Sequence, residues 1–448
     1  MPSAKRALER MHLQPPISMA LIPLVMVAAG CGGSDGQPGA GGGGGDADMT
    51  AFAGATIWDG TGAPAIQDGV LLVQEGRITA IGPADEISVP AGATEVRLDG
   101  RWVTPGLINA HGHVAGTAQG DGRVAALAEL ERYARYGITT VNSLGGEPDA
   151  AAPLRDALLP SQAGQSPRAR LLMAGAVVTG DTPEAAVQVA TENATLGVDY
   201  MKIRVDDNLG TSTKMSPEIY RAVIDAAHTR EIPLAAHLFY LDDAKDLLRS
   251  GADLVAHSVR DQPVDQELID LLIEADVCYV PTLMREVSTF VYRTRPDFLD
   301  DAMLASDVDA DQVATVTDPE FQNRMRLNPT AQRYEQALMA ASANLKTLSD
   351  GGVTIAMGTD TGPLGRFQGY FEHMELGLMV EAGLTPEQAL LTATRDAARC
   401  IDRTDLGTLA VGNHADFVVY GADPIEDIEN TRTRDIVYVG GREVAGTH

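Results

Sequence analysis

Six residues of the chain have the side-chain types and the placement to hold metal ions. They are four histidines, a lysine and an aspartate, namely His111, His113, His237, His257, Lys202 and Asp360. Nine histidines in 448 residues make a His-x-His pair uncommon by chance, and in a strand two such side chains project to the same side. Neutral imidazoles and a carboxylate are ligands that Zn²⁺ takes in proteins. The pattern therefore predicts a metal site.

Taken singly, each of these residues has an ordinary structural explanation. A lone histidine near a strand end can be a hydrogen-bonded core residue, and a lone aspartate can cap a helix. Lys202 is harder to explain, because it lies in the apolar segment 200–204 and an unpaired ammonium is costly to bury. The other five histidines do not fall at strand ends: His12, His228, His373, His414 and His448. We therefore expect the six residues to share one site.

The six residues lie at or near the ends of apolar segments that alternate with helix patterns. Continuous apolar runs suit strands that are buried on both faces. Eight such runs occur, at 104–110, 138–144, 170–178, 199–205, 232–238, 253–259, 277–283 and 354–357. Helix starts with a capping residue, proline and glutamate lie at 182–184, 216–218 and 385–388. This alternation predicts an α/β fold, a (β/α)8 TIM barrel with its chemistry at the C-terminal ends of the strands.

Both ends of the chain contain short β-rich segments. They occupy 69–74, 77–81 and 95–98 near one end, and 416–420 and 435–439 near the other. We therefore predict a small β-sandwich domain built from 50–103 plus 405–448, beside a barrel over 104–404. A polar, acidic insertion at 285–329 follows the seventh strand. Connections this long are usually functional or disordered, so both a partly helical lid or substrate wall and a plain surface insertion are open.

Residues 1–31 have the pattern of a lipoprotein signal peptide. Basic residues precede the apolar stretch 17–29, and the segment VAAGC resembles a bacterial lipobox, in which Cys31 is lipidated. The Gly-rich segment 32–49 predicts a flexible tether. We therefore expect an exported protein whose only membrane attachment is a lipid anchor in the cell envelope, at the outer membrane. A soluble exported protein that is cut nearby is the alternative.

The chain is acidic, and its composition is that of a globular protein. It has 62 acidic and 34 basic side chains, a formal net charge of −28, and 44% hydrophobic residues. We expect no nucleic-acid partner, because phosphate binding needs a basic face, and no transmembrane helix, because no run of 18 apolar residues occurs. Three cysteines exclude a disulfide framework, and we expect Cys278 and Cys400 to be buried thiols.

Several segments of the chain resemble the amidohydrolase superfamily of metal-dependent hydrolases. They read TPGLINAHGH at 104–113, GTDT at 358–361, EAGLTPEQAL at 381–390 and GTLAVG at 407–412. The resemblance extends from about residue 51 to 444. Lys202, in the fourth-strand motif DYMKI, is similar to the lysine of the branch that is related to imidazolonepropionase and to prolidase-like dipeptidases.

The resemblance implies a role for each of the six residues. His111, His113 and Asp360 would hold one divalent ion, His237 and His257 a second, and a carboxylated Lys202 would bridge them. Zn²⁺ suits these ligands, and Mn²⁺, Fe²⁺ and Co²⁺ are not excluded. Two such ions lower the pKa of a bridging water so that hydroxide exists at neutral pH. Asp360 would then act as the general base and afterwards as the general acid.

The expected reaction is hydrolysis of an amide or peptide C–N bond in a small-molecule substrate, a dipeptide or an N-acyl amino acid. Prolidase-like relatives carry a tyrosine two residues after the fifth-strand histidine, whereas here Phe239 has that place and Tyr240 follows it. Tyr240, Arg260 and Arg366 are candidate substrate contacts, although both arginines could equally be surface or helix-cap residues. A cyclic amide, ester, lactone or phosphotriester is the alternative substrate, and a non-catalytic envelope lipoprotein that binds metal or a partner is the alternative function. A homo-oligomer is also open.

Overall fold

The computed structural model describes residues 49–114, 122–156 and 167–446. The signal peptide with Cys31, and all but the last residue of the 32–49 tether, were predicted for residues outside these ranges. Among the described residues, no helix combines the length and the apolar character that crossing a membrane requires.

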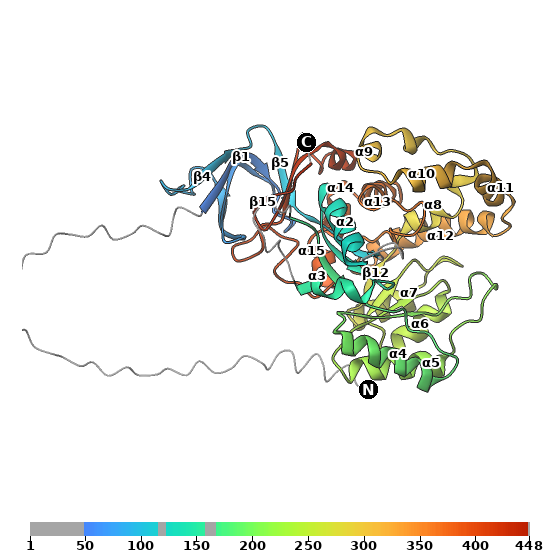
Figure 1. The fold of residues 1–448 in the computed structure, drawn as a ribbon. Helices are drawn as coiled ribbons and strands as arrows, with labels where there is room; N and C mark the ends of the chain where they lie inside the picture. The colour runs from blue at the N-terminus through green and yellow to red at the C-terminus, as the bar shows by residue number, and fades with distance from the viewer. Residues whose placement is uncertain (1–48, 115–121, 157–166, 447–448) are drawn as a thin grey trace, which may run out of the picture. The chain divides into compact units, whose positions relative to one another are not determined.

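Seven strands and one extended segment form the barrel (Figure 1). One parallel sheet contains β6 (Leu107–Gly112), β7 (Ile138–Ser143) and β8 (Arg170–Met173), and a second contains β9 (Met201–Arg204), β10 (Leu234–His237), β11 (Leu254–Ala256) and β12 (Cys278–Val280). Val178 pairs with Ile203 on one side and Tyr279 with Ile355 on the other. Ala110 N also donates to Met357 O at 2.9 Å. Segment 354–357 therefore closes the ring, which confirms the predicted barrel.

Helices follow the barrel strands along the chain. They are α2 (Gly122–Arg135), α3 (Ala152–Asp156) after η1 (Asp149–Ala151), α4 (Pro183–Leu196), α5 (Pro217–His228), α6 (Leu241–Ser250), α7 (Gln266–Glu274), α12 (Ala331–Asp350), α13 (Tyr370–Glu381), α14 (Pro386–Thr392) and α15 (Arg395–Cys400). Thr182 caps α4, and Thr385 with Gln388 forms the capping box of α14. Ser216 has the N-cap place of α5, but its side chain makes no capping hydrogen bond.

The insertion after β12 is largely helical. It contains η2 (Val291–Arg293), η3 (Asp297–Asp300), α9 (Ala302–Ala305), α10 (Ala310–Thr317) and α11 (Pro319–Leu327), after α8 (Leu283–Ser288). Asp301, Asp309 and Asp318 accept hydrogen bonds from the first backbone N–H groups of α9, α10 and α11. Three of the nine acidic residues at 285–329 therefore serve as helix caps. Its partly helical nature is confirmed, while a role as lid or substrate wall stays a prediction.

Strands from both ends of the chain share one sheet, as expected for a small β domain that is built from both ends. The sheet contains β1 (Met49–Ile57), β2 (Ile66–Gln74), β3 (Arg77–Pro83), β4 (Thr94–Arg97), β5 (Trp102–Pro105), β13 (Phe417–Tyr420), β14 (Arg434–Val439) and β15 (Arg442–Glu443), and η4 (Ile428–Thr433) precedes β14. The rings of Phe52, Phe417 and Tyr438 pack within 4.6–4.9 Å of one another in its apolar core. A buried ion pair between Arg170 of β8 and Asp416, at 2.8 Å, joins the barrel to this sheet.

Cys278 and Cys400 form a disulfide, so the prediction of two separate thiols was wrong. Their Cα atoms are 5.7 Å apart although 122 positions separate them in the chain. Cys278 begins β12 and Cys400 ends α15, and both are buried. Only the closed barrel brings these two ends together, which explains why isolated cysteines in the sequence gave no indication of pairing.

Candidate metal centre

The structure brings the six predicted residues together at the C-terminal ends of the barrel strands. The four imidazoles form a row, in which the ring centroids are 5.6 Å apart for His113 and His111, 4.5 Å for His111 and His257, and 4.1 Å for His257 and His237. Lys202 Nζ lies 3.3 Å from His111 Nε2, and Asp360 Oδ1 lies 3.4 Å from the same nitrogen. The six side chains are therefore one continuous cluster.

One half of the cluster consists of His111, His113 and Asp360, whose ligand atoms all lie within 4.8 Å of one another. His113 Nδ1 is 2.7 Å from the backbone oxygen of Gly145, so it carries the proton and donates. The lone pair of His113 Nε2 then faces Asp360 Oδ1 at 2.7 Å. Two acceptors at this distance require a cation between them or a further proton on the ring.

The other half, His237 and His257, has protein partners that the sequence did not reveal. His237 Nε2 lies 2.5 Å from Asp206 Oδ2, and His257 Nδ1 lies 2.6 Å from Thr282 Oγ1. Asp206 follows β9 and Thr282 follows β12, so both could have been found by applying the strand-end rule to every polar residue. The Thr282 hydroxyl leaves Nε2 of His257 available for another ligand.

Burial sets the charge of the cluster. It lowers the pKa of His111 and His257 well below the ordinary range and that of His237 to about 3, which keeps the rings neutral. Burial alone would raise the pKa of Asp360, but Arg366, His113 and His111 together outweigh it, and the pKa lies well below the usual value. The result is neutral nitrogen donors beside a carboxylate, and among the residues that the structure describes, the buried His111 Nδ1 has no hydrogen-bond partner. This donor set fits a divalent metal ion.

Lys202 is buried in this cluster without an acidic partner. No ion pair to it occurs within the described part of the chain, and burial lowers the pKa of its amine to about 7. A substantial share of the amine is therefore neutral at neutral pH.

A buried network orients the ends of β6 and of segment 354–357. Glu372 Oε1 accepts hydrogen bonds from Asn109 at 2.6 Å, Thr359 at 2.8 Å and Thr361 at 2.7 Å. Asn109 Oδ1 in turn accepts from the backbone N–H of His111 at 2.9 Å. These polar residues position His111 and Asp360, and the sequence offered only their proximity to the two motifs as an indication.

The three predicted substrate contacts have different surroundings. Arg366 forms an ion pair with Asp360 and donates to Ser288 Oγ at 2.9 Å, so it touches the cluster. The Tyr240 hydroxyl donates to Asp207 at 2.8 Å. Arg260 is fully buried, donates to Leu238 O at 3.0 Å and stacks over the Phe239 ring at 4.6 Å. Arg260 is thus engaged by the protein itself.

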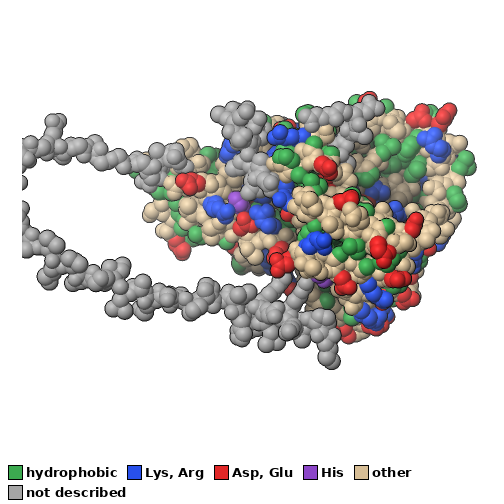
Figure 2. All heavy atoms as spheres, turned by 60° about the horizontal axis from the view of Figure 1, so that its bottom comes forward, with side chains coloured by type: hydrophobic (Ala, Val, Ile, Leu, Met, Phe, Trp, Pro, Cys, Tyr) green, Lys and Arg blue, Asp and Glu red, His purple; other side chains and the backbone are tan. Residues whose placement is uncertain are grey.

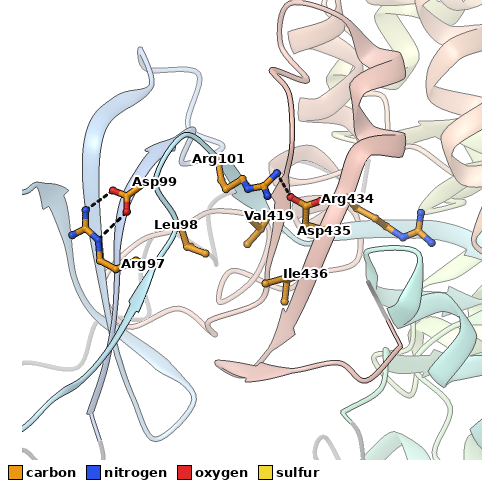
Figure 3. A pocket seen from close by; sticks show the side chains of 8 residues that line it. All are labelled: Arg97, Leu98, Asp99, Arg101, Val419, Arg434, Asp435 and Ile436. Atoms are coloured by element: carbon orange, nitrogen blue, oxygen red, sulfur yellow. Dashed lines mark hydrogen bonds and ion pairs between the residues drawn. The ribbon is translucent and has the colours of Figure 1, made fainter.

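A charged cavity of about 590 Å³ lies in the sheet domain, away from the histidines (Figure 3). Arg97 pairs with Asp99, and Arg101 Nη1 lies 2.5 Å from Asp435 Oδ2. Arg434 points away from the other lining residues and donates to Arg135 O at 2.6 Å. Acidic and basic side chains are likewise interspersed on the face shown in Figure 2. The arginine charges that line this cavity already have partners.

The fold and this cluster agree with comparisons with known proteins. The model of the amidohydrolase family matches residues 102–444, and the chain belongs to that family. An imidazolonepropionase of Mycolicibacterium smegmatis is 25% identical over 370 residues, which cover 80% of this chain and 85% of that protein. The structure of a putative prolidase from Bifidobacterium longum has a TM-score of 0.72 at 25% identity and covers 89% of this chain and 95% of that one. A Xaa-Pro dipeptidase with bound methionine in the active site has a TM-score of 0.69 at 22% identity, over 88% of this chain and 99% of that one.

The family defines the general chemistry. Its members are metal-dependent, and the relatives support a hydrolase that acts on C–N bonds of a small-molecule substrate. His111, His113 and Asp360 provide a candidate metal site of the kind this chemistry needs.

Proposed function

We propose that the chain is a binuclear amidohydrolase that cleaves the amide bond of a dipeptide or an N-acyl amino acid. The observation that carries the proposal is the convergence of four imidazoles, an amine and a carboxylate at one rim of the barrel. His111, His113 and Asp360 would hold one ion, His237 and His257 the other, and Zn²⁺ suits these ligands best.

Lys202 would join the two ions as a carbamate. A neutral amine is required for reaction with CO₂, and burial beside His111 provides it. The neutral amine nitrogen would bond to the carbon of CO₂ and release a proton, which gives an anionic carbamate whose two oxygens could serve as ligands. This change removes the cost of an unpaired ammonium in the barrel.

The chain's own residues would transfer the protons of the reaction and orient the histidine rings. When bound, the two ions supply an activated water and polarise the scissile carbonyl. Asp360 takes a proton from the attacking water and returns it to the leaving nitrogen. Arg366 helps to keep the Asp360 carboxylate ionised through their ion pair, together with His113 and His111. Gly145 O and Thr282 Oγ1 fix the ring orientations of His113 and His257.

The test is to purify the protein with Zn²⁺ and bicarbonate, measure bound metal, and assay a panel of dipeptides and N-acyl amino acids. We expect two metals per chain and turnover of members of the panel. Absence of bound metal together with absence of hydrolysis would contradict the proposal. The panel includes cyclic amides, because the similarity to an imidazolonepropionase favours them as a second candidate substrate class.

We also propose that the protein is exported and held at the cell envelope by lipid on Cys31. The Cys278–Cys400 disulfide supports this, because such bonds persist in oxidising compartments and are rare in the cytosol. Fractionation of cells that express the wild type or Cys31→Ser tests the anchor. We expect the wild type in the membrane fraction and the variant in the soluble exported fraction, and an identical distribution would contradict lipidation.

A further inference from the structure

A cluster of buried charges begins where the seventh strand of the barrel ends. Arg285 and Glu286 lie in α8, and the Arg285 Nη1 donates to Glu286 Oε1 at 2.9 Å. Arg260 approaches the same oxygen from the other side, with its Nε at 3.0 Å. The Arg285 guanidinium lies over the Tyr334 ring, 5.0 Å from its centroid. Sequence reasoning did not single out Arg285 or Glu286.

The ion pairs of this cluster join two carboxylates, those of Glu286 and Asp360, to three guanidinium groups. Arg366 pairs with Asp360, whereas Arg260 and Arg285 share one oxygen of Glu286. Within the described residues, Arg285 therefore has no carboxylate of its own, and its buried Nε has no hydrogen-bond partner. Leaving such a group unsatisfied is costly unless a ligand completes it.

Arg285 lies beside the candidate metal centre. Its charge contributes to lowering the pKa of His237, and Asp360 in turn acts on Arg285. The residue is 6% exposed, so an anion that bound there would be largely shielded from water. The Tyr334 ring in α12 fixes the plane of the guanidinium, which suits bidentate binding of a planar carboxylate.

We propose that Arg285 binds the free carboxylate of the substrate and thereby selects amides of amino acids that end in a carboxylate. Arg260 serves as the positioning residue that holds Glu286, and Glu286 holds Arg285. Arg366 is paired with Asp360. Arg260, like Arg285, has buried nitrogens without a hydrogen-bond partner among the described residues, but it is only 2% exposed against 6% for Arg285, and its Nη1 donates to the backbone oxygen of Leu238. This inference rests on the proposed amide hydrolysis and specifies its substrate class.

The experiment compares matched substrates on the metal-loaded, full-length protein. N-acetyl-L-leucine and N-acetyl-L-leucinamide differ only in the carboxylate, and Leu-Leu with its C-terminal amide forms a second pair. We expect wild type to prefer the acids in kcat/KM by about 10- to 100-fold, the range of a charge-assisted hydrogen-bond pair. Arg285→Met should lose most of that preference, mainly through a higher KM for the acids. Arg285→Lys should keep part of it.

The matched control is Arg293→Gln, which removes an arginine that pairs with Glu335 at the surface of the same insertion. This variant should keep the full preference for the acids. Thermal unfolding followed by circular dichroism establishes that each variant is folded. Calorimetric binding of N-acetyl-L-leucine and its carboxamide supplies a second readout, because it does not depend on turnover.

The outcomes separate the two proposals. Hydrolysis of acid and carboxamide at equal rates would overturn the role of Arg285 and leave amide hydrolysis intact, as would an unchanged preference in Arg285→Met. If nothing is hydrolysed, the proposed function fails. The calorimetric binding of N-acetyl-L-leucine and its carboxamide then still tests whether Arg285 binds a carboxylate. If wild type binds the acid more tightly than the carboxamide and Arg285→Met loses this difference, the carboxylate site is supported. Equal binding of acid and carboxamide by wild type overturns it.

Discussion

The barrel rim and the cavity of the sheet domain are both lined by charged residues, but their charges have different surroundings. In the cavity, Arg101 and Asp435 form an ion pair whose side chains remain 46% and 36% exposed, so the pair is partly open to water. At the rim, Lys202, His111, His237 and His257 are buried, and within the described part of the chain His111 Nδ1 has no hydrogen-bond partner. Burial without compensation is costly and is tolerated where a ligand or a reaction offsets it. The rim is therefore where we locate the chemistry.

Asp360→Asn should have the largest effect and tests the rim directly. The amide cannot accept a proton from water, so we expect turnover to fall by about 10²- to 10⁴-fold while substrate binding is largely kept. Steady-state kinetics with calorimetric binding checks both parts. Asp435→Asn in the cavity is the control and should leave kcat unchanged. Equal effects of the two variants would remove the distinction between the two regions.

Lys202→Ala should affect metal binding more than any change in the cavity. Removal of the bridging ligand should cost at least one metal per chain, measured by mass spectrometry of the purified wild type and variant. Arg101→Ala serves as the control with full metal content. An unchanged metal content in Lys202→Ala would refute the bridge and leave the lysine with a purely structural role.

The rim could be predicted from the sequence to the extent that its residues follow strand ends. His111 and His113 occupy successive inward positions, and Lys202 was conspicuous in an apolar strand, so each carried a local signal. Asp206 has the same strand-end placement, but its pairing with His237 had no local signal in the sequence. That pairing, and the stacking of Arg285 on Tyr334, arise only because separate strands and helices meet in the closed barrel. The same holds for the disulfide, whose cysteines are 122 positions apart.

Replacing Cys278 and Cys400 with alanine should cost stability without changing the chemistry of the rim. A cross-link over a loop of 122 residues restricts the unfolded chain, and its loss should lower the free energy of unfolding by roughly 2–5 kcal/mol. Urea unfolding with and without reductant measures the difference. Cys278 begins β12, whereas the rim lies at the other end of the strand, so kcat of the folded variant should match wild type.

Glu375 has a buried carboxylate whose environment differs from that of the barrel rim and from that of the cavity in the sheet domain. Its oxygens accept from the backbone N–H groups of Leu283 and Met284 at 2.7 Å, and burial raises its pKa to about 8 from 4.5. The unfolded chain therefore releases this proton at lower pH than the folded protein. Stability from this group is full below pH 4.5 and is lost as pH rises toward 8.

Glu375→Gln should remove that pH dependence. The slope of unfolding free energy against pH between 4.5 and 8 should become less negative by up to about 1.4 kcal/mol per pH unit. Urea unfolding at a series of pH values in this window measures the slope. Glu335→Gln, at an exposed surface ion pair, is the control and should leave the slope as in wild type. A slope that is equal in wild type and Glu375→Gln would show that the carboxylate titrates normally.

Arg101→Ala should have the smallest effect, because it acts on a pair that is already solvated. Removing the guanidinium leaves Asp435 exposed to water, and surface pairs of this kind contribute about 0–1 kcal/mol. We expect the free energy of unfolding to change by less than about 0.5 kcal/mol, with kcat and metal content unchanged. Urea unfolding at low and high salt measures the residual electrostatic part, which salt should screen. A loss of activity in Arg101→Ala would mean that the cavity takes part in the function and that burial alone does not identify the reactive region of this protein.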